Sequence, residues 1–175
     1  FVKHQDKSRT ASAGMFKGGL ADNQTETTRL HTAAHLLLSA LKQVLGEQVE
    51  QRGSNITSER LRFDFNNPEK LSSNQISQIE KIVNDNIKLN LPVTVEEMSI
   101  EDAKRSGAHG TFSDRYGDRV KVYTIGEGSN IVSMEICGGP HVDHTLQLFE
   151  DGKKFKIIKE ESSSAGIRRI KAVLV

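Results

Sequence analysis

The chain has 175 residues, with 24 lysines and arginines against 23 aspartates and glutamates, which gives a formal net charge of +1. Such a balance produces no strongly basic field that would by itself indicate nucleic-acid binding. Seven phenylalanines, two tyrosines and no tryptophan leave few rings for base stacking, which argues against a single-strand stacking platform. Cys137 is the single cysteine, which excludes an internal disulfide, and no apolar run approaches the roughly 18 residues of a membrane span, so we expect a cytoplasmic protein without membrane contact.

Residues 1–26 are polar and glycine-bearing without a sustained period, and they are predicted to be a linker or the edge of a preceding domain.

Three helices are predicted after this segment. Further helices are predicted over 73–90 and over 100–106, where Ser99 is a suitable N-cap. The strongest helix, over 27–46, is predicted by apolar residues at helical spacing and by the glycine that follows them: Leu30, Ala34, Leu37, Leu38, Leu41, Leu45 and then Gly46.

Alternation of apolar and polar residues predicts strands between and after the helices. EQRGS, at 50–54, is interpreted as a turn. Helices early in the chain and consecutive strands late in it predict an α+β fold, a mainly antiparallel sheet with helices packed on one face. The predicted strands are 60–65, 92–98, 120–125, 130–136, 154–160 and 167–175.

Two pairs of metal-binding residues share one spacing. His31 and His35 are four apart on the first helix and therefore lie on one face of it. Cys137 and His141 are also four apart, where a strand ends and a Gly-Gly-Pro turn begins. Three imidazoles and one thiolate are a suitable ligand set for Zn²⁺. We therefore predict a zinc site between a helix and a strand–loop corner.

Other interpretations stay open at this point. A histidine beside an apolar stripe is usually packed in the core, and a buried cysteine usually acts as a small hydrophobe. The segment HTAAH has Thr32 and Ala33 where a metalloprotease helix needs a glutamate, so peptide hydrolysis is disfavoured. If all four side chains bind the metal, the site is closed and structural, whereas metal catalysis needs an exchangeable position. We favour an arrangement in which zinc positions the substrate and one side chain binds weakly or not at all.

Six blocks in the chain carry a family resemblance: HTAAHLL, VEQRGSNI, RLRFDF, YGDRVKVYTIG, EICGGPHV and SSAGIRRIKAV. In this order they resemble the editing domain of alanyl-tRNA synthetase, and the likeness covers residues 27–175. The resemblance implies an aminoacyl-tRNA deacylase that hydrolyses tRNA(Ala) mischarged chiefly with serine, with glycine as a second candidate. It also implies that the positions of His31, His35, Cys137 and His141 surround a zinc ion.

Two neighbouring families bear on this resemblance. Freestanding alanyl-tRNA trans-editing proteins share the pattern, and GGPHV, with Pro140 where the alanyl family usually has threonine, resembles the editing domain of threonyl-tRNA synthetase. A start at Phe1 favours a domain excised from a synthetase, whose remaining chain would then be a partner, over a freestanding deacylase. A third alternative is a structural zinc module that positions tRNA without hydrolysing it.

An editing site for serine must spare alanine, although serine is the larger amino acid. Size therefore cannot discriminate, and a polar group must meet the serine hydroxyl. Thr32, between the two helical histidines, and Gln51, in the EQRGS segment, are the candidate catalytic residues for this task. The candidates for contacting tRNA phosphates are Arg52, Arg168 and Arg169. Because adjacent residues of a strand face opposite sides, we expect only one of Arg168 and Arg169 to face the site.

Overall fold

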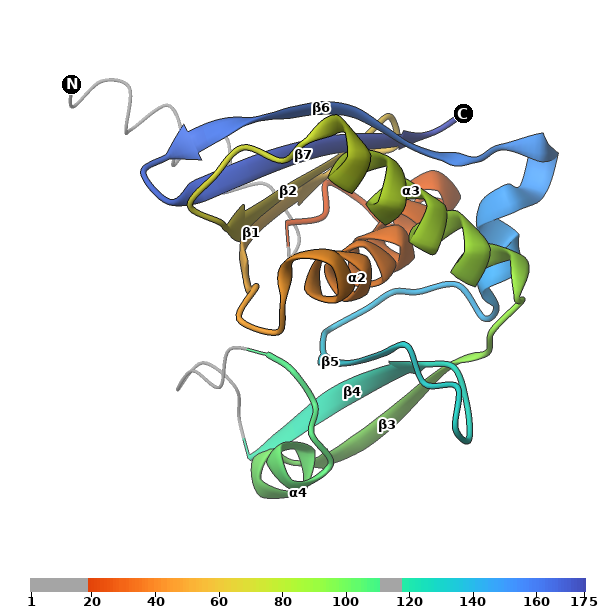
Figure 1. Ribbon diagram of the computed structural model, residues 1–175. Coiled ribbons are helices and arrows are strands. Elements are labelled where there is room, and N and C mark those ends of the chain that lie inside the picture. The colour runs from red at the N-terminus through yellow and green to blue at the C-terminus, as the bar shows by residue number, and fades with distance from the viewer. Residues whose placement is uncertain (1–18, 111–117) are drawn as a thin grey trace.

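The computed structural model describes residues 19–110 and 118–175, which form two antiparallel sheets with helices between and beside them (Figure 1). The larger sheet has the order β1-β2-β7-β6 and the smaller has the order β3-β4-β5. In the larger sheet the strands are β1 (Gln51–Ile56), β2 (Leu61–Asn66), β7 (Ile167–Leu174) and β6 (Phe155–Ser164); in the smaller they are β3 (Val93–Ser99), β4 (Arg119–Ile125) and β5 (Ser133–Ile136).

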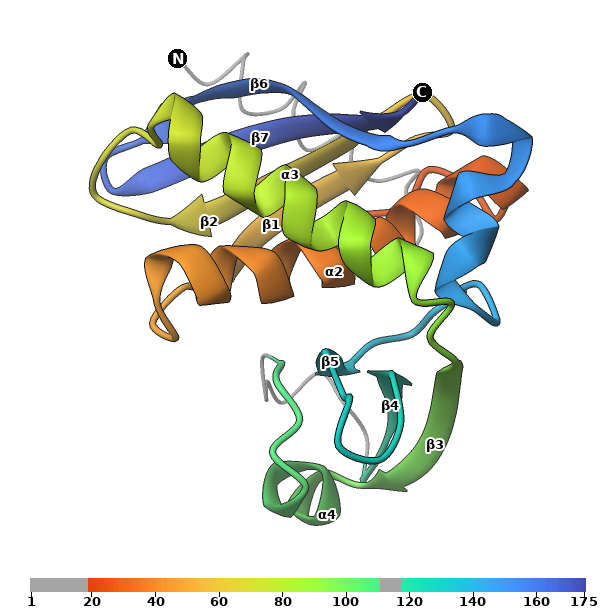
Figure 2. The ribbon, with the colours of Figure 1, turned by 45° about the vertical axis from the view of Figure 1, so that its right-hand side comes forward.

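The predicted α+β class is confirmed, with α2 (Thr25–Leu45) and α3 (Ser73–Lys88) on one face of the larger sheet. The strands form two sheets rather than one, and the smaller sheet lies on the other side of α2 (Figure 2). Local alternation identifies a strand but not its partner. In the larger sheet β2 pairs with β7 across more than a hundred residues, for example Leu61 with Ala172.

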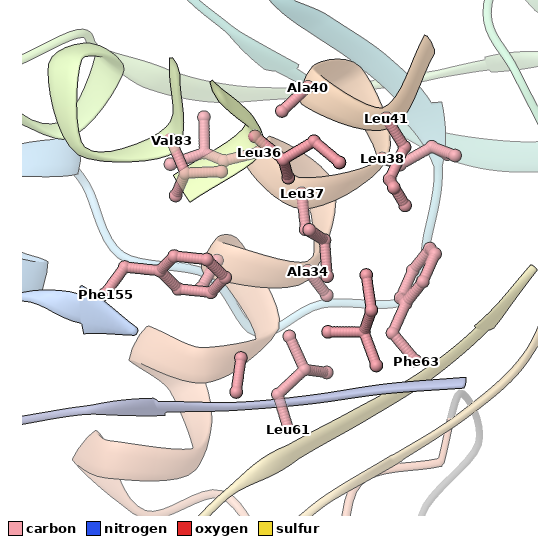
Figure 3. Packing of buried hydrophobic residues seen from close by; sticks show 14 of the residues in the cluster. Ala34, Leu36, Leu37, Leu38, Ala40, Leu41, Leu61, Phe63, Val83 and Phe155 are labelled. Carbon is pink, nitrogen blue, oxygen red and sulfur yellow. The ribbon is translucent and has the colours of Figure 1, made fainter. Parts of the chain in front are cut away.

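Helix α2 is buried around most of its circumference because it lies between the two layers. Leu36, Leu37 and Leu41 are fully buried, and Figure 3 shows Leu37 and Ala34 pointing toward Leu61 and Phe63 of β2. The helix begins at Thr25, two residues before the predicted start, and ends at Leu45. Such a helix must be apolar on several faces, so polar side chains in its middle need partners of their own.

Helix α3 covers the sheet beside α2 and is buried through Ile79, Val83 and Ile87. Its start is a capping box, in which the Ser72 side chain accepts a hydrogen bond from the Gln75 backbone and the Gln75 side chain accepts one from the Ser72 backbone. These bonds satisfy amide groups that have no partner within the helix.

The smaller sheet has its own small core. Helix α4 (Ile100–Arg105) begins at the predicted cap, where the Ser99 hydroxyl accepts from the Asp102 backbone N–H. The chain returns from β5 through residues 137–144 to a 3₁₀ segment, η1 (Thr145–Gly152), which the sequence pattern did not predict. This return passes between the smaller sheet and α2. The residues that form the small core of the smaller sheet and α4 are Ala103, Ala108, Val120, Val122 and Ile136.

Two N-terminal predictions change in detail. The EQRGS segment was interpreted as a turn, but Gln51 begins strand β1 with a register shift between Gln51 and Gly53. Leu20 is buried in the core and pairs with Ile56, whereas residues 23–25 are exposed. Residues 1–18 of the predicted linker lie outside the described part of the chain. The division of the chain at residue 26 stays a prediction. Within the described residues, no helix is long and apolar enough to span a bilayer.

Candidate metal centre

Four side chains meet between α2 and the return from β5. His31 and His35 come from α2, Cys137 directly follows β5, and His141 comes four residues later. One ligand atom from each lies within 4.8 Å of every other, which is close enough to hold a metal ion. The structure thus brings together the two predicted pairs, because α2 is enclosed between the sheets and the return loop crosses its histidine face.

The cysteine thiol lies at the centre of this cluster. Cys137 Sγ is 3.3 Å from His31 Nε2 and 3.3 Å from His141 Nε2. The ligand nitrogen of His35 also lies within 4.8 Å of the Cys137 sulfur. A thiolate with three imidazole nitrogens is a soft-to-borderline donor set of the kind that suits Zn²⁺ and related transition metals, and it suits Mg²⁺ or Ca²⁺ poorly.

The outer nitrogens of the three rings each have a partner. His31 Nδ1 is 2.9 Å from the Pro140 carbonyl oxygen, and His141 Nδ1 is 2.9 Å from the Thr32 hydroxyl. His35 Nδ1 lies 2.6 Å from Glu135 Oε2 in an ion-pair contact. Such partners fix ring orientation and leave Nε2 free to bind a metal.

The loop that carries His141 is shaped by Gly139 and Tyr123. Gly139 has a φ of +70°, and a Cβ added there would approach the Tyr123 hydroxyl to 2.3 Å, so this position requires glycine. The Tyr123 ring lies 4.5 Å from that of His141 in a tilted arrangement. The Gly139 backbone N–H also points to Cys137 Sγ at 3.3 Å. The loop therefore holds the thiol and the imidazole together.

Electrostatics favour the metal-binding form of the cysteine. Burial raises the pKa of the Cys137 thiol, but hydrogen bonds with His141 and His31 outweigh it and lower the pKa to about 3. Burial lowers the pKa of His35, but Glu135 and Cys137 together raise it to about 10. Burial lowers the pKa of His141 to about 4, opposed only in part by its hydrogen bond with Cys137. A thiolate beside neutral and cationic imidazoles is thus favoured at neutral pH.

A cleft of about 420 Å³ opens beside the cluster. One wall is the C-terminal half of α2, including Lys42, and the opposite walls are the turn after α4, including His109, and the segment 131–135. His35 and Glu135 both line the cleft. A ligand in the cleft would therefore reach the cluster from the His35 side.

Thr32 lies inside the cluster but its hydroxyl is already occupied. It is fully buried, accepts a hydrogen bond from the Val142 backbone N–H at 3.2 Å and contacts His141 Nδ1, and its donor points to the Thr28 carbonyl at 3.4 Å. A hydroxyl has one donor and two acceptor positions, so all three are used.

The other predicted site residues lie on the larger sheet. Gln51 is exposed at the start of β1 and is not among the residues that line the cleft. Each of the three arginines has an acidic partner: Arg52 lies 3.3 Å from Glu50, Arg168 pairs with Glu160, and Arg169 binds both oxygens of Asp64 at 2.8 and 3.1 Å. No hydrogen bond or ion pair among the described residues joins these four side chains to the cluster.

Sequence reasoning missed Glu135, Tyr123 and the Pro140 carbonyl. Only Glu135 left a usable signal. It stands two residues before Cys137, and because strand residues alternate in direction, residues two apart lie on the same side. The roles of Tyr123 and the Pro140 carbonyl depend on tertiary contacts that no local pattern encodes.

Comparison with known proteins bears directly on this arrangement. Residues 120–171 match the family model described as the threonyl and alanyl tRNA synthetase second additional domain. The chain is 53% identical over 174 residues to an alanine–tRNA ligase of Treponema denticola. The matched region covers 99% of this chain and 28% of that ligase. The resemblance to an alanyl-tRNA synthetase editing-type domain is confirmed.

Two further alanine–tRNA ligases extend the comparison. That of Borrelia hermsii is 51% identical over 175 residues, with 100% of this chain and 28% of the relative covered. That of Dehalococcoides mccartyi is 46% identical over 152 residues, with 87% and 17% covered. The chain thus spans little more than a quarter of the length of the first relatives that it matches.

Proposed function

We propose that this chain is the proofreading unit of an alanine–tRNA ligase and hydrolyses mischarged tRNA(Ala), chiefly Ser-tRNA(Ala) and secondarily Gly-tRNA(Ala). The observation that carries the proposal is a partly buried cluster of three histidines and one cysteine beside an open cleft, in a chain that shares about half of its residues with alanine–tRNA ligases. Its partners are the acceptor end of tRNA(Ala) and the rest of the synthetase, in the cytoplasm.

The need for a second hydrolytic site follows from the size of alanine. The aminoacylation pocket of a synthetase for alanine cannot strictly exclude glycine, which is smaller. It also discriminates only modestly against serine, which adds one hydroxyl. The aminoacyl ester is already an activated bond, so an editing site needs less catalytic power than a protease does. A cleft that admits the charged 3′ end beside the cluster meets this requirement.

Zinc is the metal that we propose for the cluster, because the donor set of one thiolate and three imidazoles fits it. When bound, zinc would supply Lewis-acid character that orients or polarises the ester group. His31, His35, Cys137 and His141 would hold it, and the cleft would admit the substrate from the His35 side. The protein groups around the cluster fix the rings, so little reorganisation would accompany substrate binding.

One observation favours a second candidate, a structural zinc module that positions tRNA without hydrolysis. All four ligand atoms lie within one small cluster, and a fully occupied four-ligand site is closed to substrate. The two candidates differ in deacylation: the structural module would bind zinc and leave Ser-tRNA(Ala) intact. Single-turnover hydrolysis of Ser-tRNA(Ala) by the purified chain decides between them.

Discrimination between serine and alanine is the specific test of the editing proposal. We propose that Thr32 orients His141, because its hydroxyl is saturated, which leaves the exposed amide of Gln51, on β1 outside the cleft lining, as the remaining sequence candidate to meet the serine hydroxyl. Thr32→Val should slow hydrolysis of both charged tRNAs together. Gln51→Ala should lower the ratio of the Ser-tRNA(Ala) deacylation rate to the Ala-tRNA(Ala) deacylation rate by roughly five- to 150-fold. This is the effect expected from losing a hydrogen bond of about 1–3 kcal/mol.

The measurement is single-turnover deacylation of Ser-tRNA(Ala) and Ala-tRNA(Ala) by the wild type and both variants. Gln78→Ala, an exposed glutamine on α3, is the matched control and should change neither rate. A ratio that narrows with Thr32→Val and not with Gln51→Ala would assign the reading of serine to the threonine instead. An unchanged ratio in both variants would refute this account of specificity.

A further inference from the structure

Glu135 makes a contact that the proposed function does not yet use. Its Oε2 lies 2.6 Å from His35 Nδ1, and the two side chains are only 12% and 9% exposed. The Ser133 hydroxyl points to the same carboxylate oxygen at 3.4 Å. Glu135 is the sole polar contact of His35 Nδ1 among the described residues.

The fold places this carboxylate by simple geometry. Glu135 and Cys137 are two residues apart at the end of β5, so their side chains extend toward the same side, which faces α2. His31 and His35, one helical turn apart on α2, face that side in return. One strand therefore supplies both a ligand, Cys137, and the outer partner of another ligand, His35.

The three outer partners differ in charge. His31 and His141 contact a backbone carbonyl and a hydroxyl, both neutral, whereas His35 contacts a carboxylate. A divalent cation with one thiolate and three neutral imidazoles carries a net charge of +1. An ionised carboxylate against one of these imidazoles brings the sum to zero, and a neutral sum matters because an uncompensated charge is costly to bury.

We propose that Glu135 is a positioning residue that holds His35 in the orientation required for metal binding and neutralises the charge of the centre. The inference rests on the proposed metal function of the same site. A ligand imidazole whose outer nitrogen is held against a carboxylate has a restricted ring orientation, as second-shell partners of metal ligands do. Because Glu135 also lines the cleft, this support lies on the side where substrate would enter.

The test measures zinc affinity of the purified chain by competition with a chromogenic chelator, without any tRNA. Glu135→Gln keeps the size of the side chain and removes its charge, and it should weaken zinc binding by about 10- to 100-fold, with Glu135→Ala weakening it further. Glu96→Ala, an exposed glutamate on β3, is the control and should bind zinc as the wild type does.

A second measurement separates positioning from packing. The Co²⁺-substituted wild type and Glu135→Gln should differ in their visible absorption bands, because a reoriented imidazole changes the ligand field, while circular dichroism of both metal-free proteins stays the same. A role in packing alone predicts that the same-sized Gln variant has the zinc affinity and spectrum of the wild type, and that result would overturn the proposal. A wild type that binds no zinc would overturn it as well.

The outcome is independent of hydrolysis. Weakened zinc binding in Glu135→Gln supports the inference even if the wild type fails to deacylate Ser-tRNA(Ala), which would refute the proposed function alone. Normal zinc binding in Glu135→Gln together with full deacylation by the wild type refutes the inference and leaves the proposed function standing.

Discussion

Protein carrying both His35→Ala and His141→Ala should be purified without stoichiometric zinc, whereas the wild type should carry about one zinc ion per chain. The double change removes two of the four ligands and leaves only His31 and Cys137. Metal binding by sets of this kind contributes about 10–16 kcal/mol, and two ligands cannot retain that affinity against buffer and purification. The measurement is elemental analysis of the purified proteins, with circular dichroism to confirm that the variant is folded.

His144→Ala is the matched control for this prediction. His144 is exposed three residues beyond His141 and lies outside the cluster, so its removal should leave zinc content unchanged. If the double variant still binds about one zinc per chain, the four-residue assignment is wrong. Loss of zinc in His144→Ala would point instead to a ligand set that includes the loop beyond His141.

Leu41→Ala should lower the free energy of unfolding by about 2–5 kcal/mol, the cost of removing a fully buried leucine from a packed core. Leu41 has an exposed fraction of 0% on α2, which is enclosed between the two sheets. The size of the effect reports whether the helix that carries His31 and His35 is held as tightly as the structure indicates. Denaturant unfolding, followed by circular dichroism, measures it.

Leu89→Ala makes the same chemical change at a position that is 56% exposed, just after α3, and it should have little effect on stability. The comparison matters because both variants lose the same side-chain atoms. Equal destabilisation by the two changes would mean that α2 is not enclosed, and the metal centre built on it could not have the geometry described.

The sequence was most informative where the relevant interactions are local. The apolar period of α2, the histidines one turn apart and the Cys–His pair beside a glycine turn are all properties of short segments, and the structure brings these segments together. The capped start of α4 at Ser99 is another local feature that pattern alone predicts correctly. These features required no knowledge of which strand pairs with which.

Long-range pairing was not predictable in the same way. The larger sheet depends on β2 pairing with the distant β7 as well as with its sequence neighbour β1, and Phe63 and Phe65 of β2 are fully buried in the core that α2 shares. Gln51 was assigned to a turn, yet pairing with Phe65 makes it the start of a strand. Tertiary contacts overrode local propensity there.

The hydrogen-bonding state of a buried hydroxyl is likewise set by tertiary structure. Thr32 was a candidate for reading serine because of its position between two histidines. Its three hydrogen-bonding positions are occupied through Thr28, Val142 and His141, two of which belong to a loop a hundred residues away. A sequence pattern shows that a hydroxyl is near a site, but not whether it is free.

The most direct test of the central claim is to measure Ser-tRNA(Ala) deacylation and zinc content on the same preparation as zinc is removed with a chelator and then restored. If the His31, His35, Cys137 and His141 cluster is a metal-dependent editing site, the single-turnover rate should fall in proportion to the zinc lost and return when zinc is added back. A folded, metal-free protein that still hydrolyses Ser-tRNA(Ala) at the full rate would contradict the account.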